Sequence, residues 1–298
     1  MSDSTFPSHT PRVSVVIATL GGYSLTSTIT ALNRGTLVPD EILVCIPEQE
    51  SPRTAHLFFK NLKIITTACR GQVAQRAFGF RQVRNELVLQ LDDDVSLRPN
   101  CLRSLVSCVE TTQKISAGPK LYDIKTGLYS SFLIPDPQGS TLFQKLMFWV
   151  INGRRGYEPG RIGRAGIGMG IPDTMQGCVD VDWLPGGCVL HRRENLVLFD
   201  FYPLKGKAFA EDLFHSRLLK KEGVTLMRCN HAECDVDLSS GVQLNPFHFM
   251  KSYVAYAAAL RQFCKDSGDS SFFLYLFLIL NLVRLIARRS TPKILKHL

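Results

Sequence analysis

The stretch that decides the fold is residues 86–99, ELVLQLDDDVSLRP, in which an apolar run stops abruptly at three consecutive aspartates. The run LVLQL is typical of a buried β-strand. Three adjacent carboxylates repel one another, so their ionised forms are costly to keep together without a compensating cation. The stretch therefore predicts a strand that ends at a charged position.

Elements of the same kind surround this strand. Apolar runs at 13–19, 41–47 and 62–67 predict further strands, and helical spacing of apolar residues occurs over 24–33 and 72–84. This order predicts an α/β fold with a mostly parallel sheet covered by helices. Ligands bind beyond the carboxyl ends of the strands in such sheets, so the aspartates lie at the expected ligand rim.

The second half of the chain is less regular. We expect helices over 100–112 and 140–152, and strands on both sides of the glycine pair within 179–193. The segment 153–170 holds seven glycines and four arginines, which predicts a mobile basic loop. The segment 209–223 starts with acidic residues and ends in lysines and a glycine, as a helix does.

Composition restricts the class of protein. The chain has 298 residues, 45% hydrophobic and 20% charged, which fits one large folded domain, alone or with a small appendage. Its net charge of +9 predicts an anionic partner, such as nucleic acid, an acidic membrane surface or a phosphate-bearing substrate. Nine scattered cysteines without a CxxC pair, and an N-terminus without an apolar signal region, favour a reducing, cytoplasmic location.

The spacing of the aspartates suits a metal ion. Asp92 and Asp94 share one face of an extended backbone, and such a carboxylate pair can hold a hard divalent ion that neutralises a diphosphate. Asp93 points elsewhere. The alternative is a solvated turn or a helix cap, which an isolated aspartate run favours.

Four blocks in order carry a family resemblance. They are VSVVIATLGG at 13–22, GQVAQRAFGFRQVRNELVLQLDDDV at 71–95, VDWLPGGCVLHRR at 181–193 and AEDLFHSRLLKKEG at 210–223. Together they resemble the family 2 glycosyltransferases, which have a nucleotide-sugar-binding GT-A fold. The resemblance implies a GT-A catalytic domain over 12–240. We expect a flexible N-terminus over 1–11 and, from the residues of the C-terminal segment, a helical, membrane-associating region over 241–298.

The resemblance also implies donor and metal contacts. The aspartate run matches the family's DXD motif, so Asp94 and Asp92 are expected to bind Mg²⁺ or Mn²⁺ on the diphosphate, and His231 is a further expected metal ligand. Family members commonly have an aspartate where this chain has CIPEQE around Glu48. Arg76 matches the arginine of an ARN segment whose asparagine is Ala77 here. The expected donor-binding residues are Thr19, Leu20, Glu48, Arg76, Asp92, Asp93, Gly186 and Gly187.

The acidic pair Glu211 and Asp212 matches the family's catalytic pair, and Asp212 is the expected general base of an inverting reaction. Displacing a nucleoside diphosphate from an anomeric carbon requires a base for the acceptor hydroxyl and a cation for the departing charge. The alternative for this pair is favourable charge at a helix N-terminus.

Two other segments allow a ligand. Cys229, His231 and Cys234 could hold zinc, but a structural zinc site needs a fourth ligand, which argues against it. The loop 153–170 could close over the donor diphosphate or a phosphorylated acceptor. Its arginines, Arg154, Arg155, Arg161 and Arg164, would supply the charge.

The C-terminal segment is apolar and then basic. Residues 272–287 are interrupted by Asn281 and Arg284, and these 16 residues fall short of the ~20 needed to cross a bilayer. With the basic residues that follow, they suit a helix lying in the headgroups of an anionic leaflet. The alternative is a core helix or an oligomer contact.

These observations favour an inverting, metal-dependent hexosyltransferase of polysaccharide biosynthesis. It would use a nucleotide-diphospho-sugar donor and a lipid-linked or polysaccharide acceptor, at the inner face of the cell membrane. A sugar nucleotidyltransferase is an alternative, although TLGGYSL replaces the basic glycine loop expected there. A membrane-bound scaffold with a degenerate site is another. No nucleic-acid partner is expected, because the basic residues are dispersed without a recognised module.

Overall fold

The computed structural model describes residues 11–110, 112–136, 139–237 and 245–290. The predictions for the N-terminal segment 1–10 and for a domain boundary at 240 fall outside these residues. So do Lys293 and Lys296 of the basic C-terminal segment.

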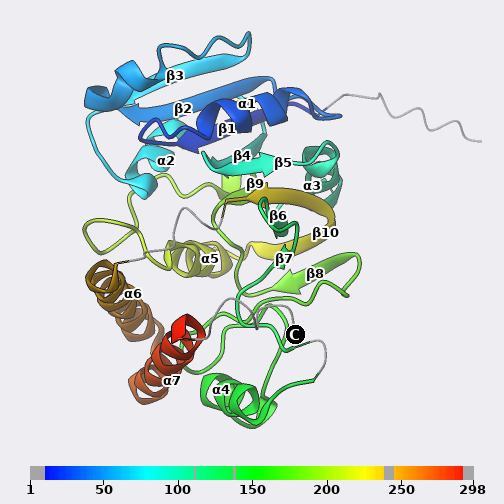
Figure 1. Cartoon of the computed structure of the whole chain (residues 1–298). Coiled ribbons are helices and arrows are strands. Elements are labelled where there is room, and N and C mark those ends of the chain that lie inside the picture. Colours follow the sequence, from blue (N-terminus) through cyan, green and yellow to red (C-terminus); the bar gives the residue numbers. More distant parts are fainter. Residues whose placement is uncertain (1–10, 111, 137–138, 238–244, 291–298) are drawn as a thin grey trace, which may run out of the picture.

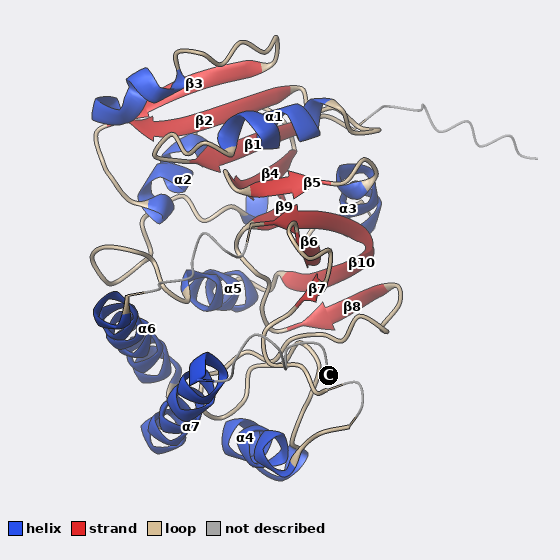
Figure 2. Ribbon diagram, in the orientation of Figure 1, coloured by secondary structure: helices blue, strands red, loops and turns tan. Residues whose placement is uncertain are grey.

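A single mixed sheet organises the molecule (Figures 1 and 2). Its strands follow the order β3-β2-β1-β4-β9-β6-β10-β5, and β7 pairs with β6 and β8 with β10. The strands are β1 (Val13–Ala18), β2 (Glu41–Pro47), β3 (Leu62–Thr67), β4 (Leu87–Asp92), β5 (Val95–Leu97), β6 (Ile115–Asp123), β7 (Tyr129–Ser130), β8 (Cys178–Val181), β9 (Cys188–Arg192) and β10 (Thr225–Val236).

The first half of the sheet is parallel, as the sequence predicts, and the second half is mixed. β1 pairs in parallel with β2 and β4, and Ala18 lies between Cys45 and Asp92 in this register. β9 is antiparallel to β4 and to β6, and β8 is antiparallel to β10. The carboxyl ends of β1, β2 and β4 therefore meet at one edge, where Asp92 lies.

Helices cover both faces of the sheet. They are α1 (Leu25–Asn33), α2 (Gln72–Phe80), α3 (Cys101–Val109), α4 (Leu142–Asn152), α5 (Glu211–Lys221), α6 (Pro246–Ser267) and α7 (Ser271–Ser290), with 3-10 turns η1 (Glu48–Thr54), η2 (Gly153–Arg155) and η3 (Arg193–Asn195). Alternate residues of β1 point to opposite faces: Val15 and Ile17 join the core beneath α1 and α3, whereas Val16 packs under α2.

A second core lies below the sheet in Figure 2 and joins α4, α6 and α7. Phe263 of α6 and Phe277 of α7 are fully buried there. α4 begins with a capping box between Thr141 and Gln144. The C-terminal helices are therefore an integral packed layer of the described structure.

The prediction of a mobile loop over 153–170 is wrong. Residues within it, including Ile167 and Met169, are buried in the second core. Arg161 donates to Asp180 at 2.6 Å, and the Arg164 guanidinium lies 3.4 Å from the centre of the Phe273 ring. These two arginines are held by structural contacts, so they do not support the predicted closure over a diphosphate.

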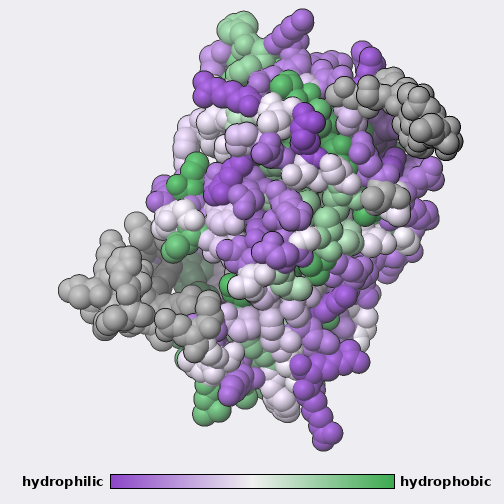
Figure 3. Space-filling model, turned by 90° about the vertical axis from the view of Figure 1, so that its right-hand side faces the viewer, coloured by the Kyte–Doolittle hydropathy of each residue, from purple (hydrophilic) through white to green (hydrophobic). Residues whose placement is uncertain are grey.

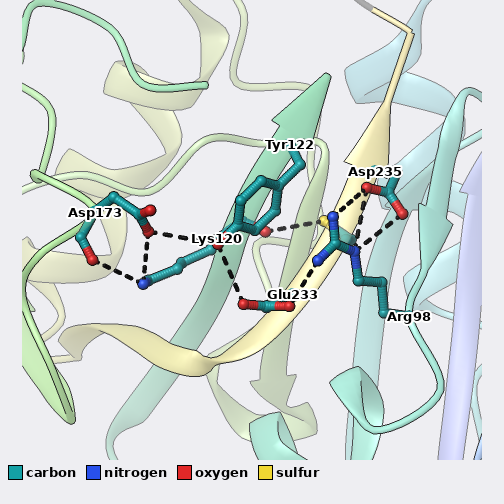
Figure 4. A network of polar contacts seen from close by, with 7 residues as sticks. Arg98, Lys120, Tyr122, Asp173, Glu233 and Asp235 are labelled. Carbon is teal, nitrogen blue, oxygen red and sulfur yellow. Dashed lines mark hydrogen bonds and ion pairs between the residues drawn. The ribbon is translucent and has the colours of Figure 1, made fainter. Parts of the chain in front are cut away.

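A polar network fixes the edge of the sheet next to the aspartate turn (Figure 4). Arg98, directly after β5, pairs with Glu233 and Asp235 of β10 at 2.8 Å each. On β6, Lys120 pairs with Asp173 at 2.7 Å. The network therefore ties β5 to β10 and the segment before β8 to β6.

Candidate active site

Arg76 of α2 joins two carboxylates from distant parts of the chain. It donates to Asp92 at the end of β4, and to Glu211 at the start of α5 at 2.5 Å. Gln72, one turn earlier on α2, also donates to Asp92, at 2.8 Å. Asp92 is thus held by two donors from one helix, and the start of α5 is tied to the carboxyl end of β4.

The two carboxylates stabilise the positive charge of Arg76. Its side chain is only 4% exposed, and burial by itself would disfavour the charged form. The carboxylates of Glu211 and Asp92 outweigh the burial and raise the pKa of Arg76 above its ordinary value. One oxygen of Glu211 (Oε2) and Nε of Arg76 are buried without a hydrogen-bond partner among the described residues. Unsatisfied groups of this kind are suited to receive a ligand or water.

Asp93 anchors the loop after β1. Its carboxylate accepts a hydrogen bond from the Thr19 hydroxyl, and its carbonyl accepts one from Thr28 of α1 at 2.9 Å. A side chain at Gly22 would lie 3.2 Å from the Asp93 carboxylate. Burial raises the pKa of Asp93, and the hydrogen bond from Thr19 opposes that rise. Asp93 therefore positions the 19–22 loop. Asp93 and Asp94 form a turn between β4 and β5, so the backbone is not extended across the three aspartates as the sequence analysis assumed.

Asp94 has the properties of a cation ligand. Burial, followed by the charges of Asp92 and Asp93, raises the pKa of Asp94 to about 6. Asp237, just beyond β10, adds further negative charge. A divalent cation would relieve this concentration of charge.

The aspartates fit a metal ion that is shared with a substrate. Asp93 turns to Thr19 and Asp92 to Arg76, so the three carboxylates do not converge on one point. Mg²⁺ and related ions are usually bound by one or two carboxylates together with substrate phosphates and water. Asp94 and the second oxygen of Asp92 would hold such an ion, which supplies positive charge to a diphosphate.

The structure does not bring His231 to this site. Val236 pairs with Val95, next to Asp94, and His231 lies five positions earlier on β10, within an irregular part of the strand. Its side chain is exposed. The strand register therefore contradicts the prediction of His231 as a metal ligand. Asp237 adds negative charge near Asp94 and pairs with Lys125 at 3.3 Å.

The two glycines lie between the carboxylates. A side chain at Gly186 would collide with Glu211, and one at Gly187 would lie 3.3 Å from Asp92. Gln90 of β4 donates to the Gly186 carbonyl at 2.5 Å, and the Asp92 amide donates to the Gly187 carbonyl at 2.8 Å. A side chain at Gly186 would therefore displace the Glu211 carboxylate from its pair with Arg76, and one at Gly187 would crowd Asp92.

The start of α5 has unusual backbone geometry. Ala210 has φ 54°, a left-handed conformation that is uncommon for a residue with a side chain and costs about 1–3 kcal/mol. The next residue, Glu211, is turned inward and buried. Burial, and then the charge of Glu211, raise the pKa of Asp212 to about 7. Asp212 can therefore accept a proton near neutral pH.

Asp212 faces a cavity of about 360 Å³. The cavity is lined mainly by apolar groups from the 167–171 segment, the 183–185 segment and the start of α5. Its polar members include Asp212, Arg228 and Tyr256, the last from α6. Trp183 also lines it, packs against the second core and donates to the Met169 carbonyl at 3.1 Å.

The remaining predicted donor residues lie at the same edge of the sheet. Thr19 is buried at the end of β1, Leu20 is partly exposed after it, and Glu48 is exposed at the end of β2. Gln75, which the sequence analysis missed, donates to the carbonyls of Thr19 and Cys45 at 2.9 and 2.8 Å. The sequence did contain a signal for Gln75, because the polar residues 72, 75 and 76 share one face of the predicted helix.

The comparisons with known proteins agree with this arrangement. Residues 14–160 match the family model described as Glycosyl transferase family 2. The match covers just under half of the chain and confirms the resemblance seen in the sequence. A search of curated proteins found no match.

One solved structure confirms the GT-A fold. The crystal structure of GalNAc-T7 with UDP, GalNAc and Mn²⁺ is similar with a TM-score of 0.55 at 16% identity, over 78% of this chain and 44% of that one. TarS of S. aureus is similar with a TM-score of 0.44 at 13% identity, over 83% of this chain and 39% of that one. This chain thus spans less than half of either protein.

The bridge made by Arg76 leads to a stability prediction. Replacement Arg76→Met leaves Glu211 and Asp92 facing each other without their cation, so the free energy of unfolding should fall by about 3–5 kcal/mol. Urea denaturation measures this change. The matched control is Arg84→Met, whose side chain is exposed and whose loss should change stability by less than about 0.5 kcal/mol.

The double variant Arg76→Met/Glu211→Gln separates charge from packing. It should regain part of the lost stability, because one of the two unpaired carboxylates is removed. If Arg76→Met were as stable as Arg84→Met, the bridge would not be a structural requirement.

Proposed function

We propose that the chain is an inverting glycosyltransferase that transfers a hexose from a nucleotide-diphospho-sugar to a hydroxyl acceptor. The observation that carries the proposal is the Arg76 bridge, which joins the Asp92–Asp94 turn to the acidic start of α5. One end of this unit suits a diphosphate and its cation, and the other end offers Asp212 as a base. The family-model match over residues 14–160 supports the same chemistry.

The proposed reaction is a single displacement. The acceptor oxygen bonds to the anomeric carbon as the bond from that carbon to the diphosphate oxygen breaks, and the proton of the hydroxyl passes to Asp212. The electron pair of the broken bond leaves with the nucleoside diphosphate. A divalent ion, Mg²⁺ or Mn²⁺, held by Asp94 and Asp92 would stabilise that charge. Attack from the face opposite the leaving group inverts the anomeric configuration.

The donor and acceptor would occupy different parts of the site. We assign the nucleotide to the sheet edge formed by Thr19, Leu20 and Glu48, and the diphosphate to the aspartate turn. The sugar would lie over Gly186 and Gly187. The acceptor would enter the cavity beside Asp212, whose apolar lining favours a lipid-linked glycan or the flat face of a polysaccharide.

Metal-dependent release of nucleoside diphosphate is the first expected activity. Incubation with a panel of nucleotide sugars and Mn²⁺ should release the diphosphate from one donor, and a chelator should stop the release. Asp94→Ala and Asp212→Ala should each reduce the rate by about 10²–10⁴-fold, because they remove the cation ligand and the base. Asp266→Ala, an exposed carboxylate on α6, is the matched control and should retain full rate. Absence of release for every donor would favour a non-catalytic scaffold.

The activity should depend on pH through Asp212. Because the base must be ionised, kcat/KM should fall about tenfold per pH unit below about 7 and level off above it. Glu211→Gln removes the neighbouring charge that raises the pKa of Asp212, so the acidic limb should move to lower pH. Initial rates at saturating metal measure both profiles. A flat wild-type profile between about pH 5 and 8 contradicts Asp212 as the base.

The proposal includes a location on the inner face of the cell membrane. α7 buries Leu274 and Phe277 in the second core, and its other face exposes Phe272, Tyr275, Ile279, Val283 and Ile286. α4 and α6 also expose apolar residues, including Leu142, Trp149, Phe247 and Val254. No helix in the described part of the chain is long and apolar enough to cross a membrane. An interfacial position, with the net positive charge facing anionic lipid, fits these features.

Vesicle binding tests this location. The double change Ile279→Glu/Val283→Glu alters the exposed face of α7 and leaves the core intact, so cosedimentation with phosphatidylglycerol vesicles should fall at least about tenfold. Phe58→Glu is the matched control, since Phe58 is 86% exposed at the far end of the sheet and its replacement should have no effect. Equal sedimentation of both variants would exclude α7 from the contact.

A further inference from the structure

Three cysteines meet outside the residues that form the candidate active site. Cys108 lies in the last turn of α3, Cys178 begins β8, and Cys229 lies opposite Cys178 on β10. Their sulfur atoms all lie within 4.8 Å of one another. In the residues that the structure describes, this is the one group of three potential ligands so close together.

The spacing is nearly that of a metal site. A zinc–sulfur bond of about 2.3 Å places tetrahedral sulfur ligands about 3.8 Å apart, so the three sulfurs need to move by about 1 Å or less. Soft ions such as Cu⁺ and Zn²⁺ prefer thiolate ligands. Three thiolates complete a trigonal Cu⁺ site, or a Zn²⁺ site with water at the fourth position.

The surroundings allow an ion to enter. The Cys108 thiol and the backbone amides of His231 and Ala232 donate to Cys229 and lower its pKa, against the effect of burial. The hydrogen bond with Cys229 and then burial raise the pKa of Cys108, and burial raises the pKa of Cys178, so a bound ion has to displace the protons of these two thiols. Cys178 is exposed, whereas Cys108 and Cys229 are buried, so an ion can enter from the Cys178 side. α3 and β8 lie on the right-hand side of Figure 1, which faces the viewer in Figure 3 and is mainly hydrophilic.

We propose that Cys108, Cys178 and Cys229 form a binding site for one soft metal ion, Cu⁺ or Zn²⁺. The bound ion replaces the thiol protons, which are released to solvent. It would join the end of α3 to β8 and β10. β8 directly follows the 153–177 segment. Part of that segment lines the cavity beside Asp212. A bound ion would therefore stabilise the strand next to this cavity.

A titration with Cd²⁺ tests the site through its sulfur ligands. The full chain is reduced with a phosphine under argon, freed of metal and held in millimolar Mg²⁺ to occupy the carboxylate site. Cd²⁺ should then produce a thiolate charge-transfer absorbance that saturates at one equivalent. Zn²⁺ and Cu⁺, each added separately, should show which of the two ions displaces it.

Variants make the test specific to the three cysteines. Cys178→Ser changes an exposed side chain and should weaken Cd²⁺ binding by more than about 100-fold, since even changes around a metal's ligands cost 10–100-fold. Cys69→Ser is the control, because Cys69 is exposed and lies outside the group, and it should bind as the wild type does. No saturable absorbance, unchanged binding by Cys178→Ser, or failure of both ions to displace Cd²⁺ would overturn the proposal.

Discussion

The ion pairs of Arg76 with Asp92 and Glu211 are the interactions on which the rest of the site depends. They connect α2, the end of β4 and the start of α5. The glycine turn at 186–187 passes between the same two carboxylates, so a side chain there would break the arrangement. Asp212 and the aspartate turn are positioned relative to each other through this one buried cation.

Much of this arrangement could be predicted from local sequence. The apolar run before Asp92 defines a strand, and the parallel alternation of elements places its end at the ligand rim. The strand and its position use residues that lie close together in the chain, where strand and helix periodicity is informative. Gly186 and Glu211 were identified through the family resemblance that the LPGG and AED blocks carry.

Other features arise from contacts between distant residues, which periodicity does not report. The exclusion of His231 and the approach of Asp237 follow from the register of β10 against β5. The loop 153–170 was predicted to be mobile because its glycines and charges are typical of solvated segments. In the fold, Arg161 meets Asp180 of β8, and the apolar residues of the loop complete the second core. The approach of Cys108 to Cys178 and Cys229 likewise required the tertiary structure.

The central claim is that the Asp92–Asp94 turn holds a divalent ion on a donor diphosphate. Anomalous X-ray scattering from crystals grown with Mn²⁺ and a nucleoside diphosphate tests it most directly. The account predicts one strong manganese peak between Asp94 and the diphosphate, next to Asp92, and no such peak in Asp94→Ala crystals. A diphosphate bound elsewhere, or a manganese peak remote from Asp94, would contradict it.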